Sequence, residues 1–214
     1  MRKLLIFTDS LSLPRSHPQV VTHPETWPEM LRKEGFEVCL SAIGGATLKD
    51  LQKQLFYFQN DAYFDAVIVQ SGIVDCAPRF VKKWELKILQ SIPFLGKKTL
   101  TCLNKNWVRQ ARNITYHSPG KFSQSVRTFE DAFSCPVVFL GILPATEAYE
   151  NTLPGITKNI DAYNQILSSA KHFVSLNTIP TEGIMSDHHH LNTKGHQFVK
   201  EKVCEKLTTC ATRT

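Results

Sequence analysis

Short apolar runs recur along the chain and are separated by polar turns. Five of them have the length of buried strands: Lys3–Phe7, Phe36–Ser41, Asp65–Gln70, Pro136–Ile142 and Phe173–Leu176. In the clearest run, Ala66-Val67-Ile68-Val69, consecutive side chains are apolar, so we expect both faces of the strand to be covered. Continuous runs of this kind are typical of a parallel sheet packed between helices.

Stretches with helical spacing lie between these runs. In Thr47–Phe58, for example, Leu48, Leu51, Leu55 and Phe58 fall on one helical face. The other predicted helices are Thr26–Lys33, Phe80–Leu89, Asn106–Arg112, Phe122–Phe133, Ile156–Ala170 and a last one that Asn192 caps and that runs to about Thr208. The rest of residues 93–115 is ambiguous. This alternation predicts a three-layer α/β/α sandwich with a parallel five-stranded sheet, flavodoxin-like in layout.

The composition agrees with one folded domain over residues 1–214, because 42% of the residues are hydrophobic and 21% are charged. Large aromatic residues on helices are far more often core residues than ligand contacts. We therefore expect the core to include Trp27, Phe56, Phe58, Trp84, Phe129, Phe133 and Phe198.

The net charge of +6 tolerates anionic partners, but the positive residues are scattered along the chain. Their densest groups are Lys82-Lys83, Lys97-Lys98 and the pair Arg109 and Arg112. We interpret each group as a solvated face rather than a nucleic-acid groove. Since no recognisable nucleic-acid motif is present either, we expect no nucleic-acid partner.

The six cysteines form no CxxC pair and no zinc-like spacing. Their even number leaves disulfides open, although a reduced, buried cysteine is ordinary in apolar strands. The first apolar run is too short for a signal peptide and is ended by Asp9, and no stretch approaches the length of a membrane span. We therefore expect a cytoplasmic protein without membrane association, and the sequence leaves its oligomeric state open.

Polar segments follow the predicted strands, in the loops where sheets of this kind place their sites. The first strand is followed by Thr8-Asp9-Ser10, the second by Gly44-Gly45-Ala46-Thr47 and the third by Ser71-Gly72-Ile73-Val74-Asp75. A fourth segment, residues 186–196, precedes the last predicted helix and contains four of the eight histidines.

These four segments resemble, in order, the four sequence blocks of the SGNH hydrolase superfamily, also called GDSL esterases and lipases. Thr8-Asp9-Ser10 stands where that family has Gly-Asp-Ser, Gly45 matches the glycine of the second block, and Gly72-Ile73-Val74-Asp75 stands for Gly-x-Asn-Asp. Asp187-His188-His189-His190 matches Asp-x-x-His, and Leu191-Asn192-Thr193-Lys194-Gly195-His196 matches the x-Asn-x-x-Gly-His that often follows it. The resemblance spans the chain from the first block to the fourth.

The resemblance implies a catalytic triad and an oxyanion hole. Ser10 would attack an ester carbonyl, His190 would take its proton, and Asp187 would orient the imidazole. The backbone N–H groups of Ser10 and Gly45 would bind the oxyanion. Asp75 is expected to support the site by capping or bonding the Ser10 loop.

The sequence departs from the family at Val74, which stands where the third oxyanion donor, an asparagine, is expected. Loss of one such donor typically lowers kcat by about 10²–10³. The candidates to replace it are Arg79, Arg15 and the pair Asn104 and Asn106. We favour Arg79, because a cation there would stabilise the oxyanion or bind an anionic substrate.

Some of these residues have other interpretations. Asp9-Ser10 alone would be taken for a helix cap or Asx turn. The histidine run, with Asp187 and His196, could bind a divalent metal. His190 and His196 are six residues apart, however, and not the four that place two ligands on one helical face. We therefore predict the triad and no metal. His188 and His189 are expected to face solvent or substrate, and His196 to support the loop from the last helix.

The function that the resemblance implies is ester hydrolysis through an acyl-serine intermediate, without a cofactor. The substrate would be a small ester or an acylated sugar. The segment Asp9-Ser10-Leu11-Ser12-Leu13-Pro14-Arg15 is similar to the start of superfamily members associated with bacterial surface-polysaccharide synthesis, which favours an acetyl or other short acyl group on a carbohydrate. Two alternatives remain: an acyltransferase with the same triad, and a non-catalytic ligand-binding protein, which Val74 suggests.

Overall fold

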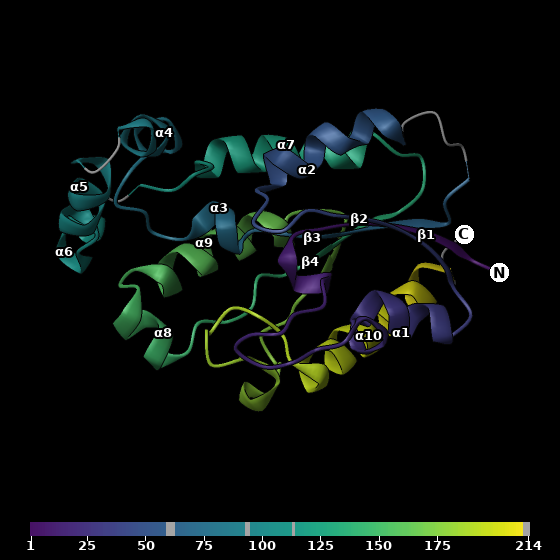
Figure 1. Cartoon of the computed structure of the whole chain (residues 1–214). Helices are drawn as coiled ribbons and strands as arrows, with labels where there is room; N and C mark the ends of the chain where they lie inside the picture. The colour runs from purple at the N-terminus through teal and green to yellow at the C-terminus, as the bar shows by residue number, and fades with distance from the viewer. Residues whose placement is uncertain (59–62, 93–94, 113, 212–214) are drawn as a thin grey trace.

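Five parallel strands form one sheet in the order β2-β1-β3-β4-β5 (Figure 1). The computed structural model describes residues 1–58, 63–92, 95–112 and 114–211. The strands are β1 (Lys3–Thr8), β2 (Glu37–Ala42), β3 (Ala66–Gln70), β4 (Val137–Leu140) and β5 (His172–Val174). This order and the all-parallel pairing confirm the flavodoxin-like α/β/α sandwich that the alternating sequence pattern predicts.

The strands β1, β3 and β4 bury both of their faces, as the continuous apolar runs predict, whereas the edge strands β2 and β5 are only partly buried. In β1, Leu5 and Phe7 pack into one core cluster, whereas Leu4 and Ile6 pack into the other. The same alternation continues in β3 and β4, because successive side chains of a strand point to opposite faces. The sheet therefore separates two hydrophobic cores, each closed by its own layer of helices.

Figure 1 shows the helices in two layers. One core is covered by α1 (Trp27–Lys33) and α10 (Thr193–Ala211). The other is covered by α2 (Leu48–Gln52), α7 (Pro119–Asp131) and α9 (Ile156–Ser168). At the carboxyl ends of the strands lie α3 (Ile73–Cys76), α8 (Glu147–Thr152) and a group formed by α4 (Lys83–Ser91), α5 (Leu95–Leu103) and α6 (Asn106–Arg112). Short 3-10 helices are η1 (Ser10–Ser12), η2 (His23–Glu25), η3 (Lys53–Tyr57) and η4 (Thr181–Gly183).

The helices depart from the sequence prediction mainly at the edges of the sandwich. The segment predicted as one helix, Thr47–Phe58, divides into α2 and η3. The helices α3, α5 and α8 were not predicted; α3 and α8 have only four and six residues, too few for a periodic pattern to emerge. Asn192 caps the last helix as predicted, since its Oδ1 accepts the N–H groups of Lys194 and Gly195.

Two of the aromatic residues expected in the core are on the surface. Phe56 is 76% exposed and Trp84 is 60% exposed, so the prediction for both is wrong. Trp27 and Phe129 are fully buried as predicted. Phe58, Phe133 and Phe198 are half-buried against the cores. The buried apolar residues of α2 and η3 face the core. Phe56 is exposed because it lies on the opposite side of the helical turn.

The described helices include none that is both long enough and apolar enough to cross a lipid bilayer. Cys76, Cys102, Cys135, Cys204 and Cys210 are free thiols in the structure.

Gly195, in the first turn of α10, allows a close approach to η4. A Cβ atom at Gly195 would collide with the carbonyl oxygen of Gly183 and lie 2.9 Å from Cδ2 of Leu191. Asn192 donates its backbone N–H to the same carbonyl oxygen at 3.1 Å. The start of α10 is therefore fixed against η4, and this contact positions the loop of residues 184–192 between them.

We predict that Gly195→Ala lowers the free energy of unfolding by about 2 kcal/mol, because either backbone must move to admit the methyl group. For a chain of this size the melting temperature should fall by about 4–8 °C, measured by thermal unfolding. Gly120→Ala is the matched control, since a Cβ at Gly120 meets nothing within 4 Å. Equal stability of the two variants would contradict the prediction.

Candidate active site

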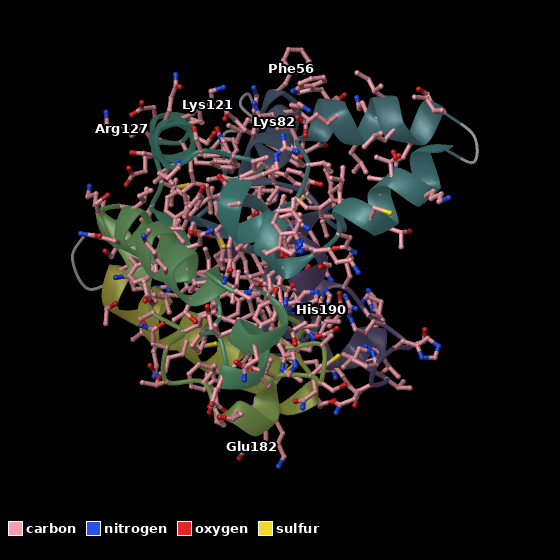
Figure 2. All side chains as sticks on the ribbon, turned by 90° about the vertical axis from the view of Figure 1, so that its left-hand side faces the viewer. Phe56, Lys82, Lys121, Arg127, Glu182 and His190 are labelled. Atoms are coloured by element: carbon pink, nitrogen blue, oxygen red, sulfur yellow. The ribbon has the colours of Figure 1, made fainter. Side chains whose placement is uncertain are left out.

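Two loops bring the predicted triad together at the carboxyl edge of the sheet. Ser10 begins η1 directly after β1. The loop of residues 184–192 is closed by an antiparallel bridge between Ile184 and Leu191 and by the hydrogen bond from Met185 N–H to the His190 carbonyl at 2.8 Å. Figure 2 looks onto this edge, with His190 near the middle of the view.

Ser10, His190 and Asp187 form one hydrogen-bonded chain. The Ser10 Oγ lies 2.9 Å from His190 Nε2, and His190 Nδ1 lies 2.7 Å from Asp187 Oδ2. The second carboxylate oxygen, Asp187 Oδ1, accepts the backbone N–H of His190 at 3.1 Å. The short spacing between aspartate and histidine thus allows one loop to orient the imidazole through both carboxylate oxygens.

Burial keeps the imidazole of His190 neutral. Loss of solvation lowers its pKa to about 4, although the hydrogen bond to Asp187 works in the opposite direction. Burial works to raise the pKa of Asp187, but the hydrogen bond and positive charge of His190 outweigh it and hold that pKa below its usual value. At neutral pH the pair is therefore an unprotonated imidazole beside a carboxylate, the state that a general base requires.

Asp9 shapes the turn that carries Ser10. Its Oδ1 accepts the N–H of Leu11 at 3.0 Å and caps η1. Its Oδ2 has no hydrogen-bond partner among the described residues, and the same is true of Ser12 Oγ and Gln70 Nε2. Complete burial raises the pKa of Asp9 to about 7. The turn is thus compatible both with Asp9 as a helix cap and with Ser10 as a member of the triad.

The loop after β2 lies beside the Ser10 turn. Ile43 donates its N–H to the Thr8 carbonyl at 3.0 Å, and Gly45 has a φ of +70°, a conformation that favours glycine. Asp75 holds α2, the helix that follows this loop, because both of its carboxylate oxygens lie 3.1 Å from the backbone nitrogen of Leu48. Asp75 thus supports the site through the loop of the second block.

His117 is a partner of Asp75 that no sequence motif indicates. Its Nδ1 lies 2.8 Å from Asp75 Oδ1, and both side chains are buried. Tyr163 donates its hydroxyl to the His117 carbonyl. His117 stands alone in the sequence, 42 positions from Asp75, so no local pattern marks the pair.

Val74 packs its side chain against the core and offers no donor, as its residue type predicts. Arg79 lies next to it: Nη2 is 3.4 Å from the Val74 carbonyl oxygen, and the guanidinium covers the ring of Tyr116 at 4.5 Å. The buried Nε of Arg79 has no partner among the residues that the structure describes. The structure therefore brings a cation to the segment that lacks the asparagine.

The other candidates for that role are placed less directly. Arg15 donates from Nη1 to the His17 carbonyl at 3.4 Å, and its positive charge helps to lower the pKa of His190. Asn104 and Asn106 are exposed beside α6, and Asn104 Oδ1 accepts a hydrogen bond from Arg109.

His188 and His189 line the rim of the triad, in agreement with the prediction that they face solvent or substrate. Tyr149, from α8, stacks on both rings, with centroid distances of 5.7 and 5.9 Å. Its position in an unpredicted helix explains why the sequence did not indicate it. His196 lies in α10 but supports α1 rather than the loop, since its Nδ1 accepts the Trp27 N–H at 3.2 Å.

A metal would have to compete with the triad. Asp187, His189 and His190 place ligand atoms within 4.8 Å of one another, which is close enough for one divalent ion. However, the two ring nitrogens of His190 already contact Ser10 and Asp187. His196 is outside this set and bonds elsewhere.

A separate cavity of about 530 Å³ lies at the opposite end of the strands. Its lining includes Pro136 and Val137 at the start of β4 and His172 at the start of β5. Because it lies at the amino ends of the strands, it is not part of the triad site.

Known structures share this fold over nearly the whole chain. A lipase/acylhydrolase from Enterococcus faecalis matches with a TM-score of 0.64 and 14% identity, over 97% of this chain and 95% of that one. A carbohydrate acetylesterase family member from Sinorhizobium meliloti matches with a TM-score of 0.63 and 12% identity, over 98% and 99%. A member of the lipolytic G-D-S-L family from Veillonella parvula matches with a TM-score of 0.60 and 12% identity, over 97% and 99%.

No protein-family model and no curated protein matches the chain. The chain shares the fold of these solved lipases and esterases. At identities of 12–14%, the likeness establishes the fold and not the reaction.

We predict that Asp9→Asn becomes progressively more stable than the wild type as pH rises from 4 to 7. Folding raises the pKa of Asp9 from 3.8 to about 7. Between these two pH values, Asp9 is deprotonated in the unfolded chain but still protonated in the folded protein. The folded wild type therefore loses about 1.4 kcal/mol of stability for each pH unit between the two values, and Asn does not titrate. Urea unfolding of both proteins at several pH values measures the difference; a difference independent of pH would refute the assignment.

Proposed function

We propose that this protein hydrolyses a carboxylic ester through an acyl-serine intermediate on Ser10. The observation that carries the proposal is the unbroken chain from Ser10 Oγ to His190 Nε2 at 2.9 Å and from His190 Nδ1 to Asp187 at 2.7 Å. A nucleophile within hydrogen-bond reach of a base, which a carboxylate orients in turn, is the arrangement of serine hydrolases. Solved esterases and lipases with the same fold support the proposal.

In the first half-reaction, Ser10 Oγ attacks the ester carbonyl carbon while its proton passes to His190 Nε2. The tetrahedral adduct then expels the alcohol, which takes that proton, and the acyl group stays on Ser10. In the second half-reaction, water attacks the acyl carbon while one of its protons passes to His190 Nε2. The tetrahedral adduct then releases the acid, and His190 returns the proton to Ser10 Oγ. Asp187 stabilises the imidazolium that forms in each half-reaction.

The oxyanion would be bound by the backbone N–H groups of Ser10 and Gly45. The position of the Gly44–Gly45 turn beside η1 supports this assignment, since a Cβ at Gly44 would lie 3.8 Å from Cδ1 of Leu13. The left-handed backbone of Gly45 is one that other residues rarely adopt.

For the substrate, we propose a short acyl group, such as acetyl, on a carbohydrate. One structural neighbour is described as a carbohydrate acetylesterase family member, which supports this choice. The half-buried His188 and His189 stack on the buried Tyr149 and lie beside the triad, and imidazole rings in this position suit the apolar faces of a sugar.

We predict that the protein turns over p-nitrophenyl acetate and that Ser10→Ala lowers kcat by at least about 10³-fold, because the nucleophile is lost. Ser12→Ala is the matched control: it removes a hydroxyl from the same turn and should retain the wild-type rate. A fluorophosphonate probe should label the wild type and not Ser10→Ala. Turnover should persist with a chelator present.

Other outcomes distinguish the alternatives. Acyl transfer to an added alcohol that exceeds hydrolysis would identify an acyltransferase. Activity lost on chelation would favour a metal at Asp187, His189 and His190. If the wild type neither turns over the ester nor reacts with the fluorophosphonate, the protein is a binding protein with an incomplete oxyanion hole.

We further propose that Arg79 replaces the side-chain donor that Val74 lacks. Its guanidinium already lies 3.4 Å from the Val74 carbonyl oxygen, and the stacking on Tyr116 holds it there. An arginine side chain carries five N–H donors, so the contact with Val74 leaves others to bind an oxyanion.

We predict that Arg79→Ala lowers kcat for a neutral acetate ester by about 10²–10³-fold, the effect of losing one oxyanion donor. A neutral substrate is chosen so that binding of an anionic group cannot account for the loss. Arg127→Ala is the control, because Arg127 is exposed on α7 and lies far from His190 in Figure 2. An unchanged kcat in Arg79→Ala would show that Arg79 has no part in the oxyanion hole.

A further inference from the structure

The positive charge of the chain is concentrated in one segment. Residues 82–92 and 95–112, which we call the helical cap, comprise α4, α5 and α6. The cap contains eight lysines and arginines and one acidic residue, Glu85. The rest of the chain, with 17 basic and 18 acidic residues, is almost neutral. The net charge of +6 therefore comes from the cap.

The cap also exposes large apolar side chains. In α4, Trp84, Ile88 and the following Ile92 are 60%, 51% and 42% exposed, and their spacing of four residues places them on one helical face. Leu86 and Leu89 of the same helix are half-buried. In α6, Trp107 is 70% exposed. The helix α4 thus has an inner apolar face and a second, outer one that the described residues do not cover.

The arginines of the cap bond to α4 and to the loop that leads into the cap, whereas the described lysines are exposed. Arg112 donates to the Phe80 carbonyl at 2.8 Å and pairs with Glu85, and Arg109 donates to the Pro78 carbonyl at 3.0 Å. The four lysines of the cap whose side chains the structure describes, Lys82, Lys87, Lys98 and Lys105, are all exposed. The apolar face and the lysines are therefore available together.

Figure 1 shows the three cap helices together at the left, beyond the carboxyl ends of the strands, the edge at which the triad lies. Figure 2, viewed from that side, shows the cap helices above and beside His190. A surface that binds the cap would therefore lie near the entrance of the site.

We propose that the helical cap docks on the surface of an anionic lipid bilayer. Trp84, Ile88 and Ile92 would enter the boundary between headgroups and acyl chains, and the exposed lysines would contact acidic headgroups. A helix with Trp and aliphatic residues on one face and lysines around it is the arrangement of interfacial helices. The sequence alone suggested that the basic groups of this segment are solvated faces. The exposed apolar side chains beside them lead to a different interpretation.

The composition of the surface favours a bilayer over other anionic partners. A nucleic acid would use the lysines and could stack on tryptophan, but Ile88 and Ile92 would gain nothing from phosphates or bases. A second copy of the chain would bury the isoleucines but would bring another strongly positive cap nearby. Only an anionic surface with an apolar interior satisfies both the charge and the exposed isoleucines.

The contribution of the positive charge of the cap is tested by co-sedimentation of the protein with vesicles of phosphatidylcholine, with and without phosphatidylglycerol. We expect binding only to the mixed vesicles, and weaker binding in high salt. Replacing Lys82, Lys87, Lys98 and Lys105 by Gln should reduce the affinity at least about tenfold, because one lysine at an anionic surface contributes roughly fivefold. The control replaces four exposed lysines outside the cap, Lys33, Lys49, Lys158 and Lys171, and should bind like the wild type.

The apolar face is tested by fluorescence and by substitution. Trp27 is fully buried, so a blue shift on addition of mixed vesicles reports Trp84 and Trp107. Combined Trp84→Ser, Ile88→Ser and Ile92→Ser should abolish binding without lowering the melting temperature, because these side chains face outward. Val20→Ser removes an exposed apolar side chain elsewhere and should have no effect.

Three results would overturn the proposal. The first is equal binding of the wild type to neutral and anionic vesicles, or to neither. The second is a stable dimer that Ile88→Ser dissociates, which would show that a second copy covers the face. The third is binding of an oligonucleotide as tight as that of vesicles and unchanged in the Trp84, Ile88 and Ile92 variant. The ester hydrolase assay is independent of all three.

Discussion

The strand β1 is hydrogen-bonded on both sides, to β2 and to β3, in parallel register. Thr8 pairs with Ala42 on one side and with Gln70 on the other, so the three strands end at one level. Because these strands run in the same direction, the loops after them leave the sheet at one edge. This register brings the turns of Ser10 and Gly45 and the segment of Val74 together, and the triad depends on it.

Burial then determines the chemistry at that edge. His190 is largely removed from solvent, which lowers its pKa to about 4 and leaves the imidazole neutral. Asp9, directly before Ser10, is completely buried, and its pKa rises to about 7. Desolvation disfavours the charged form of both groups, although their pKa values move in opposite directions. Asp187 alone keeps its charge, because His190 bonds one of its oxygens through the ring and the other through the backbone. The charge of the triad is thus confined to the carboxylate.

The helical cap obeys a different constraint. The sandwich buries its apolar residues in two closed cores, whereas α4 presents Trp84 and Ile88 outward and carries its lysines beside them. Attachment depends on a few polar contacts, such as those of Arg109 and Arg112 with backbone carbonyls. A segment built in this way is stabilised by the sandwich, and its outer face contributes nothing to the core. Its surface chemistry is therefore open to a partner, independently of the triad.

The sequence by itself determined the sheet, which follows from local patterns, and the resemblance of its four blocks predicted that Ser10, Asp187 and His190 lie together. Continuous apolar runs identify buried parallel strands. Asp187 and His190 lie in one loop, and the resemblance of the four sequence blocks points to Ser10 as their partner. Only the tertiary structure decided what depends on distant residues: the pairing of His117 with Asp75, the stacking of Tyr149 on the histidines, and the position of Arg79 against Val74. It also decided which aromatic residues are exposed. A helical pattern shows that a segment has an apolar face, but whether another element covers that face is set by packing between parts of the chain that the pattern does not connect.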